Sequence, residues 1–210
     1  MKAFIFYGGW SGHTPKESAE LTGSKLRENG AEVILDDKLD SLNDLQFLET
    51  LDLIIPMWTM GHLSDMQTKN LSKAVKNGVG LAGFHGGMGD AFRGNIEYEW
   101  MTGGIFVGHP HVGKYIVNIP DCGNPLVNGM KKSFEYESEQ YYMLTDPGND
   151  ILATAVYRLE GKEIKMPVVW TKAWGKGKVF YSALGHSSTE LVKNPEVLDM
   201  TIRGVLWAAK

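Results

Sequence analysis

Short apolar runs alternate with helix-like segments through the first half of the chain, and this alternation limits the fold more than any other feature. Four runs are typical of buried strands: Lys2–Tyr7, Ala31–Leu35, Leu51–Met57 and Val79–His85. Helical patterns separate them at Pro15–Asn29 and Met66–Lys76, and an Asn-Gly pair closes each. Strands separated by helices of about 10–15 residues form βαβ units with right-handed crossovers. The sequence therefore predicts an α/β fold with a mainly parallel sheet and helices on both faces.

The second half is richer in strands and turns. Strand patterns lie at Ile105–Val107, Lys114–Ile119, Asp150–Tyr157, Val168–Ala173 and Val179–Leu184. The last two are predicted to form a hairpin, and Asn194-Pro195 opens a final helix to Ala209. The stretch Tyr141–Asn149 is too short to separate domains, so residues 1–210 are predicted to form a single domain. The expected class is an open flavodoxin-like sheet, in which ligands bind at the carboxyl ends of the strands.

The composition disfavours several classes of function. The 210 residues carry a formal net charge of -4 with scattered lysines, which argues against a nucleic-acid interface. No apolar segment approaches the ~20 residues of a membrane helix, and the N-terminal residues lack a signal-peptide pattern. The single cysteine, Cys122, allows no internal disulfide. We expect a cytoplasmic protein with no membrane partner, and a homo-oligomer is possible because dimers are common.

All six histidines lie near a predicted strand end or beside a glycine. They are His13, His62, His85, His109, His111 and His186. Several loops of one sheet edge that carry histidines indicate convergence on one pocket. His85 and His186 are the best functional candidates, whereas His62 and His111 fit ordinary turn positions better.

His85 has an unusual setting, because Gly83–Gly87 reads as a strand, a glycine-flanked histidine and then a helix. This is the arrangement of a nucleophile elbow. Imidazole there is a candidate general acid or base, with His186 or His13 as its partner. It is also a candidate Zn²⁺ ligand together with His109, His186 and a carboxylate. A structural role as a helix cap is the remaining interpretation.

Aromatic and acidic residues accompany the histidines. Trp10 and Trp58 lie in the same loops and could stack on a sugar ring, whereas Trp170 lies in mid-strand and is expected in the core. Glu139, in the segment SFEYESEQYY, could orient a histidine or bind hydroxyl groups. The sequence contains no Walker loop, dinucleotide fingerprint or paired cysteines.

Four ordered segments resemble the ThuA-like (trehalose-utilisation) family. They are GLAGFHGG, EWMTGGIFVGHP, PVVWTKAWGKGKVFYSALGH and the closing helix that ends in VLWAA. The resemblance implies a fold similar to the class I glutamine amidotransferases, with His85 in place of their elbow cysteine. Glutamine hydrolysis through a thiol is therefore not expected, and a link to carbohydrate utilisation is.

The resemblance also bears on the pocket residues. Family members commonly show an Asp-Glu-x-Tyr-like element where this chain has Ser138-Glu139-Gln140-Tyr141. This similarity supports Glu139 and Tyr141 as pocket residues. The candidate substrate-binding residues are Trp10, Trp58, Gly86, Gly87, His109 and Tyr141, and the candidate catalytic residues are His85, His186, Glu139 and His13.

Three functions remain open at this point. The first is an enzyme that acts by general acid–base chemistry on a sugar or keto-sugar derivative. The second is a Zn²⁺-dependent hydrolase or isomerase that uses the same histidines. The third is a non-catalytic protein that binds a small molecule or a partner.

Overall fold

The computed structural model describes all 210 residues, and one mixed sheet of nine strands runs through the chain in the order β2-β1-β3-β4-β9-β8-β7-β5-β6. The strands are β1 (Lys2–Gly9), β2 (Glu32–Asp36), β3 (Leu53–Thr59), β4 (Gly80–Phe84), β5 (Gly104–Asn118), β6 (Ser133–Thr145), β7 (Asp150–Leu159), β8 (Lys162–Trp174) and β9 (Gly177–Ser182). The helices are α1 (Pro15–Glu28), α2 (Leu45–Glu49), α3 (Asp65–Lys76), α4 (His85–Gly89), α5 (Ile96–Thr102), α6 (Ser188–Lys193) and α7 (Pro195–Ala208). Short 3-10 turns are η1 (Ser11–His13), η2 (Asp40–Asn43) and η3 (Pro125–Val127).

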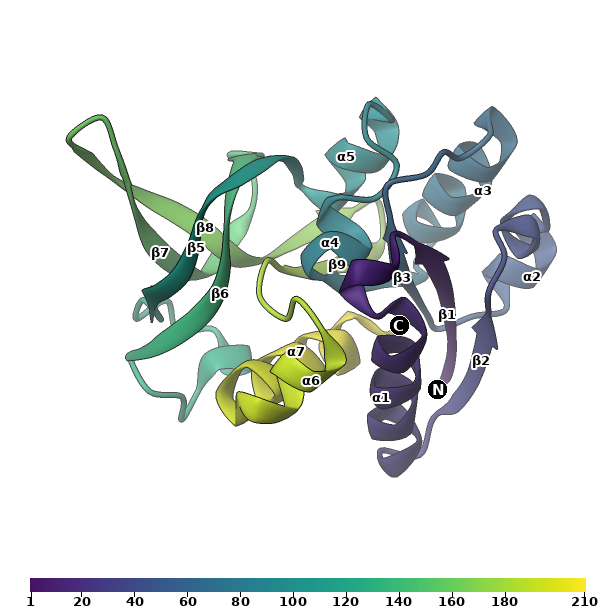
Figure 1. Cartoon of the computed structure of the whole chain (residues 1–210). Helices are drawn as coiled ribbons and strands as arrows, with labels where there is room; N and C mark the ends of the chain where they lie inside the picture. The colour runs from purple at the N-terminus through teal and green to yellow at the C-terminus, as the bar shows by residue number, and fades with distance from the viewer.

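The strands from β2 to β9 in this order form a parallel half. Helices α1 and α7 contact each other beside it, and α2, α3 and α5 form a second group (Figure 1). Every residue of β4 and nearly every residue of β3 is buried, as expected for strands covered on both faces. The α/β class expected from the sequence is confirmed. None of the helices combines the length and apolarity that a membrane span requires.

The remaining strands form an antiparallel half, in which β8 pairs with β9, β7 with β8, and β5 with both β7 and β6. Four strand pairings are thus parallel and four antiparallel, so the expectation of a mainly parallel sheet is wrong for the second half. The connections from β7 to β8, residues 160–161, and from β8 to β9, residues 175–176, are too short for the crossover that a parallel pairing needs. The predicted hairpin between β8 and β9 is confirmed.

Strands β5 and β6 differ most from the sequence-based expectation. The sequence predicts two separate strands at Ile105–Val107 and Lys114–Ile119. All of these residues except Ile119 lie in the single strand β5 of 15 residues, whose pairing is irregular near Gly108. The 13 residues of β6 were not predicted as a strand, because their glutamates have low β propensity. The stretch Tyr141–Asn149, the weakest point of the predicted domain, lies in β6 and the turn that follows it.

Buried apolar side chains form one cluster of 53 residues. Trp170 is buried, as expected, and its ring centroid lies 4.6 Å from that of Tyr181. The Tyr181 hydroxyl donates a hydrogen bond to the carbonyl oxygen of His85 at 3.2 Å. The core thus supports the backbone at the point where β4 ends and α4 begins.

Candidate functional site

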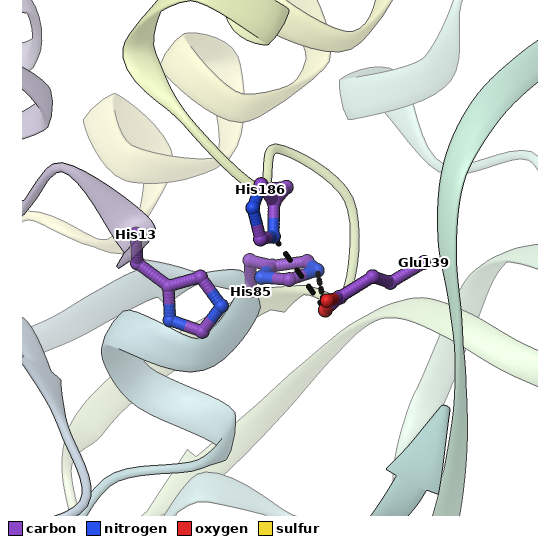
Figure 2. A group of neighbouring side chains, drawn as sticks. All are labelled: His13, His85, Glu139 and His186. Atoms are coloured by element: carbon purple, nitrogen blue, oxygen red, sulfur yellow. Dashed lines mark ion pairs between the residues drawn. The ribbon is translucent and has the colours of Figure 1, made fainter. Parts of the chain in front are cut away.

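Four side chains from separate parts of the chain converge at the carboxyl edge of the sheet. His13 ends η1 after β1, His85 begins α4 after β4, and His186 lies in the loop after β9. Glu139 reaches the same point from β6 (Figure 2). One nitrogen or oxygen atom from each of the four lies within 4.8 Å of the others. We refer to these four residues as the histidine cluster.

The backbone around His85 makes this approach possible. Phe84 is extended, His85 adopts a left-handed φ of 45°, and α4 begins at once. A non-glycine residue in this conformation is uncommon and strained, as at many functional sites. A Cβ atom at Gly86 would collide with the His13 ring and lie 3.0 Å from the Tyr141 hydroxyl. Glycine at position 86 therefore lets α4 pack directly beneath the cluster.

Two of the histidines are held through their Nδ1 atoms. His13 Nδ1 lies 2.7 Å from Thr59 Oγ1, and His85 Nδ1 lies 3.0 Å from the Tyr141 hydroxyl. The Nε2 atoms of both rings are buried and have no hydrogen-bond partner, and the same holds for Nδ1 of His186. Buried polar atoms without partners are rare and point to an absent ligand or ion. Three ring nitrogens of the cluster are thus left for such a group.

The Glu139 carboxylate faces these nitrogens. Its Oε2 lies 3.7 Å from Nε2 of His85 and 3.5 Å from Nδ1 of His186 (Figure 2). Its Oε1 lies 3.7 Å from Nε2 of His109, whose side chain is 44% exposed at the rim. Ligand atoms of a tetrahedral Zn²⁺ site, each about 2.0–2.1 Å from the metal, lie about 3.3–3.4 Å apart. The separations of Glu139 from His85 and His186 are close to this value, and the ligand atoms of all four residues lie within 4.8 Å of one another.

Burial keeps two histidines of the cluster, His13 and His85, neutral. It is the main cause that lowers the pKa of His13 from its ordinary value of 6.5 to about 4, and the nearby His186 and His109 add to the effect. Burial, followed by the effect of His13, also lowers the pKa of His85 well below 6.5. Neutral imidazole carries the lone pair that binds a metal. At pH 7 both rings are therefore in the form that can act as a ligand.

Tyr141 remains protonated beside His85, because burial raises the pKa of its hydroxyl far above the ordinary value. If His85 Nε2 binds a metal, its Nδ1 must carry the proton and donate it to the oxygen of Tyr141. If His13 Nε2 binds the same metal, its Nδ1 likewise carries the proton and donates it to Thr59 Oγ1. An oxygen acceptor behind each ring is the usual arrangement for metal-bound histidines.

The structure places the two candidate tryptophans differently. The Trp10 ring is 46% exposed, and its centroid lies 4.7 Å from that of His13 and 6.5 Å from that of His186. The Trp58 ring instead packs over Gly8 and beside Gly61. Trp10 therefore borders the cluster, and Trp58 lies at the neighbouring strand ends.

The remaining histidines lie outside the cluster. His109 lies next to the cluster, where its ring approaches Glu139. The metal ligands expected from the sequence included His109 and omitted His13, whereas the structure groups His13 with His85 and His186. His62 lines a separate pocket, and His111 is exposed with its ring near the Lys114 carbonyl oxygen. His62 lies in the loop after β3, as expected for a turn residue, whereas His111 lies in strand β5 opposite Gln140, so the expectation of a turn position is wrong for His111.

Glu190 was missed by the sequence analysis but supports the cluster. Its Oε1 accepts hydrogen bonds from the Tyr136 hydroxyl and from the backbone N–H of His186, the latter at 3.1 Å. Its Oε2 accepts from Ser138 Oγ at 3.1 Å. Glu190 thereby joins the His186 loop to the strand that carries Glu139. Nothing in the local sequence SSTELVK marks this role, because a glutamate in a first helical turn is ordinary.

Comparisons with known proteins agree with this architecture. The family model ThuA, described as trehalose utilisation, matches residues 2–208. A protein from Bacteroides uniformis described as ThuA-like has a TM-score of 0.77 at 18% identity, with 100% of this chain and 93% of that chain covered. A similarly described protein from Parabacteroides merdae has a TM-score of 0.74 at 20% identity over 100% and 90% of the two chains. A cytoplasmic protein from Salmonella typhimurium has a TM-score of 0.66 at 14% identity over 100% and 99%. Among curated proteins, none matches the sequence.

Proposed function

Because the chain belongs to the ThuA (trehalose-utilisation) family, we propose that it is a metal-dependent enzyme that acts on a carbohydrate derivative, with the histidine cluster as its Zn²⁺ site. One observation carries the proposal: three buried imidazole nitrogens without hydrogen-bond partners surround one carboxylate. A buried, partly satisfied polar group is costly unless a ligand completes it. Three neutral imidazoles and a carboxylate form a donor set that suits Zn²⁺.

Each residue of the site has a distinct role in this proposal. His13, His85 and His186 hold the metal through the nitrogens that lack partners, and Glu139 supplies the oxygen ligand. A bound Zn²⁺ would polarise a carbonyl or hydroxyl oxygen of the substrate or lower the pKa of a bound water. Catalytic Zn²⁺ sites keep a position for water or a substrate oxygen beside their protein ligands, and the cluster would hold such an oxygen in the same way.

His109 is the best-placed residue to transfer a proton. Its ring is nearly half exposed at the rim and lies beside Oε1 of Glu139. His85, by contrast, is 1% exposed, and both of its nitrogens are engaged in this proposal, one toward Tyr141 and one toward the metal. We therefore assign to His109 the general acid–base role that the sequence had suggested for His85.

The substrate class rests on the rim and on the family. Trp10 is about half exposed and its ring lies beside that of His13, and tryptophan faces stack well on sugar rings. The family is described by its part in trehalose utilisation. A sugar or keto-sugar that stacks on Trp10 would place an oxygen near the cluster.

We also infer that the parallel half is related to the flavodoxin-like, class I glutamine amidotransferase fold. Its strand order β2-β1-β3-β4-β9 has the 2-1-3-4-5 pattern of flavodoxin-like sheets. His85 stands at the elbow after β4, so amide hydrolysis by a cysteine nucleophile is not part of the proposal. A cytoplasmic location remains a prediction, and the description of the Salmonella typhimurium protein favours it.

The deciding experiment is metal analysis of protein purified without chelator, followed by Zn²⁺ titration against a competing chelator. We expect about one zinc per wild-type chain and near-total loss in His85→Ala and His13→Ala. His111→Ala is the matched control, because His111 is exposed and lies outside the cluster. Zinc binding that survives in both cluster variants would overturn the proposal. Keto-sugars and glycosides are then screened for turnover with the zinc-loaded protein.

A further inference from the structure

Arg93, between α4 and α5, is fixed in place by a buried acid. Its Nε donates to Oδ1 of Asp90, and its Nη2 donates to Oδ2 at 2.8 Å. Asp90 is 4% exposed, whereas the Arg93 side chain is 52% exposed. The third nitrogen of the guanidinium, Nη1, makes no hydrogen bond within the chain. One edge of the guanidinium is therefore anchored and the other is presented to solvent.

This open edge lies one aromatic ring from the histidine cluster. Arg93 Cζ lies 5.4 Å from the centroid of the Phe106 ring, and that ring lies 4.4 Å from the ring of Tyr141. Tyr141 in turn bonds to His85, and Phe106 also lies 6.1 Å from His109. Arg93 and Phe106 thus lie next to Tyr141 and His109 on one side of the cluster. Trp10 lies next to the rings of His13 and His186.

Neutralising Asp90 accounts for only part of this arrangement. A buried carboxylate needs a cationic or hydrogen-bonding partner, and Nε and Nη2 supply it. That role uses one edge of the guanidinium, and it does not account for the partly buried Phe106 ring under the guanidinium or for the free Nη1. Arginine fixed in this way is pre-organised to bind a second anion at its open edge.

Space for such a group is present beside Arg93. The residue lines a pocket of about 400 Å³ together with Lys69 and His62. Glu97, on the same pocket, is already bonded to Ser72 and Lys76, and Asp65 begins α3. Lys69 and Arg93 are the cationic residues of this pocket, Asp65 and Glu97 are its acidic ones, and the histidine cluster lies outside its lining.

From this geometry we propose that the substrate is an anionic carbohydrate derivative, with a carboxylate or phosphate group that Arg93 binds while its reacting part lies over the histidine cluster. The inference rests on the proposed function, because it assumes that substrate binds at the cluster. With Zn²⁺ bound to three neutral imidazoles and one carboxylate, the site would carry a net charge of about +1, which favours the same class of ligand. Guanidinium groups form charge-assisted, geometrically specific bonds with both kinds of anion.

The test measures binding of matched ligands to the zinc-loaded protein by calorimetry. The probes are glucose, glucuronate and glucose 6-phosphate, which separate a neutral sugar, a carboxylate source and a phosphate source. We expect wild type to bind one of the two anions at least about 10-fold more tightly than glucose, as for a charge-assisted hydrogen bond. Arg93→Gln should remove this difference between the anionic probes and glucose.

Two controls keep the result interpretable. Arg158→Gln removes one positive charge from an exposed residue of β7 and should retain the preference, which separates a specific contact from net charge. Arg93→Lys keeps a cation beside Asp90, so a folded Arg93→Lys protein without the preference excludes simple unfolding. Equal binding of neutral and anionic probes by wild type, including no binding of either, overturns the inference.

Failure of the proposed function gives a different pattern. A preference for anions that survives Arg93→Gln but disappears in His85→Ala means that the anion binds the metal directly, which overturns the role of Arg93 and leaves the metal site intact. If zinc binding is retained in every cluster variant, the metal site itself is refuted, whatever the probes show. The two hypotheses are therefore judged on separate readouts.

Discussion

Three of the four cluster side chains come from loops at the carboxyl ends of parallel strands, whereas Glu139 comes from the interior of the antiparallel strand β6. The parallel half places His13, His85 and His186 together because its strands all end at one edge of the sheet. The antiparallel half has no such common edge. Its contribution depends on how the β5–β6 pair lies against the body of the domain (Figure 1).

The two halves also divide the chemistry. The parallel half supplies neutral imidazoles, and the antiparallel half supplies the charged ligand and the Tyr141 hydroxyl behind His85. Tyr136 and Ser138 of the same strand bond to Glu190 beside the His186 loop. One strand therefore both completes the site and holds a loop of the other half in place. The four-residue cluster is therefore complete only when the two halves of the sheet are packed together.

The largest effect is expected from removing the charge that the antiparallel half contributes. Glu139→Gln keeps the shape of the side chain but loses the anionic ligand, so zinc affinity should fall by about 100-fold or more. Chelator competition measures this change. Glu135→Gln is the control, because Glu135 lies on the same strand, is exposed and pairs with Lys114. An unchanged affinity in Glu139→Gln would mean that the parallel half alone forms the site.

Acid should destabilise the metal-free protein through the histidines of the parallel half. His13 has a pKa of about 4 when folded and an ordinary value of 6.5, so the unfolded chain binds a proton that the folded chain excludes between these values. The free energy of unfolding therefore falls as the pH drops below 6.5, by about 2 kcal/mol at pH 5 from His13 alone. Urea unfolding at pH 7 and pH 5 measures this loss. His13→Gln should lose about 2 kcal/mol less, and an identical pH dependence in both proteins would contradict the assignment.

Intermediate effects are expected from the oxygen atoms behind the rings, one from each half. Thr59→Val removes the partner of His13, and Tyr141→Phe removes the partner of His85. Each change should weaken zinc binding by about 10- to 100-fold, as for other outer partners of metal-bound histidines. Thr50→Val, at an exposed position, is the matched control. If neither variant differs from this control, the Nδ1 contacts do not orient the rings for a metal.

The smallest effect is expected at the contact between the halves. Glu190→Gln weakens the bonds to Tyr136 and to the His186 backbone without touching any ligand atom. Zinc affinity should fall by about 5- to 10-fold because the His186 loop is held less firmly. Glu196→Gln, which removes an exposed ion pair with Lys131, should leave zinc affinity unchanged. Equal affinities in the two variants would show that the parallel half positions His186 unaided.

Prediction from sequence succeeded where local pattern and geometry agree. The alternation of strands and helices marked the parallel half, and histidines at its strand ends fall at one edge of the sheet by the geometry of βαβ units. Glu139 was a candidate from its own segment and was supported by the resemblance to a family, whereas Tyr141 was identified only through that resemblance. The strand β6 itself escaped prediction, since its repeated glutamates do not read as a strand.

The sequence by itself determined the α/β class, the loops that carry the histidines and the elbow-like arrangement of glycines around His85, because each depends on neighbouring residues in the chain. Only the tertiary structure decided which histidines meet, that Glu139 faces them, and that Arg93 lies near the rim. These contacts join residues tens of positions apart across strands of opposite direction. Their distances follow from packing between the two halves, which no local sequence pattern records.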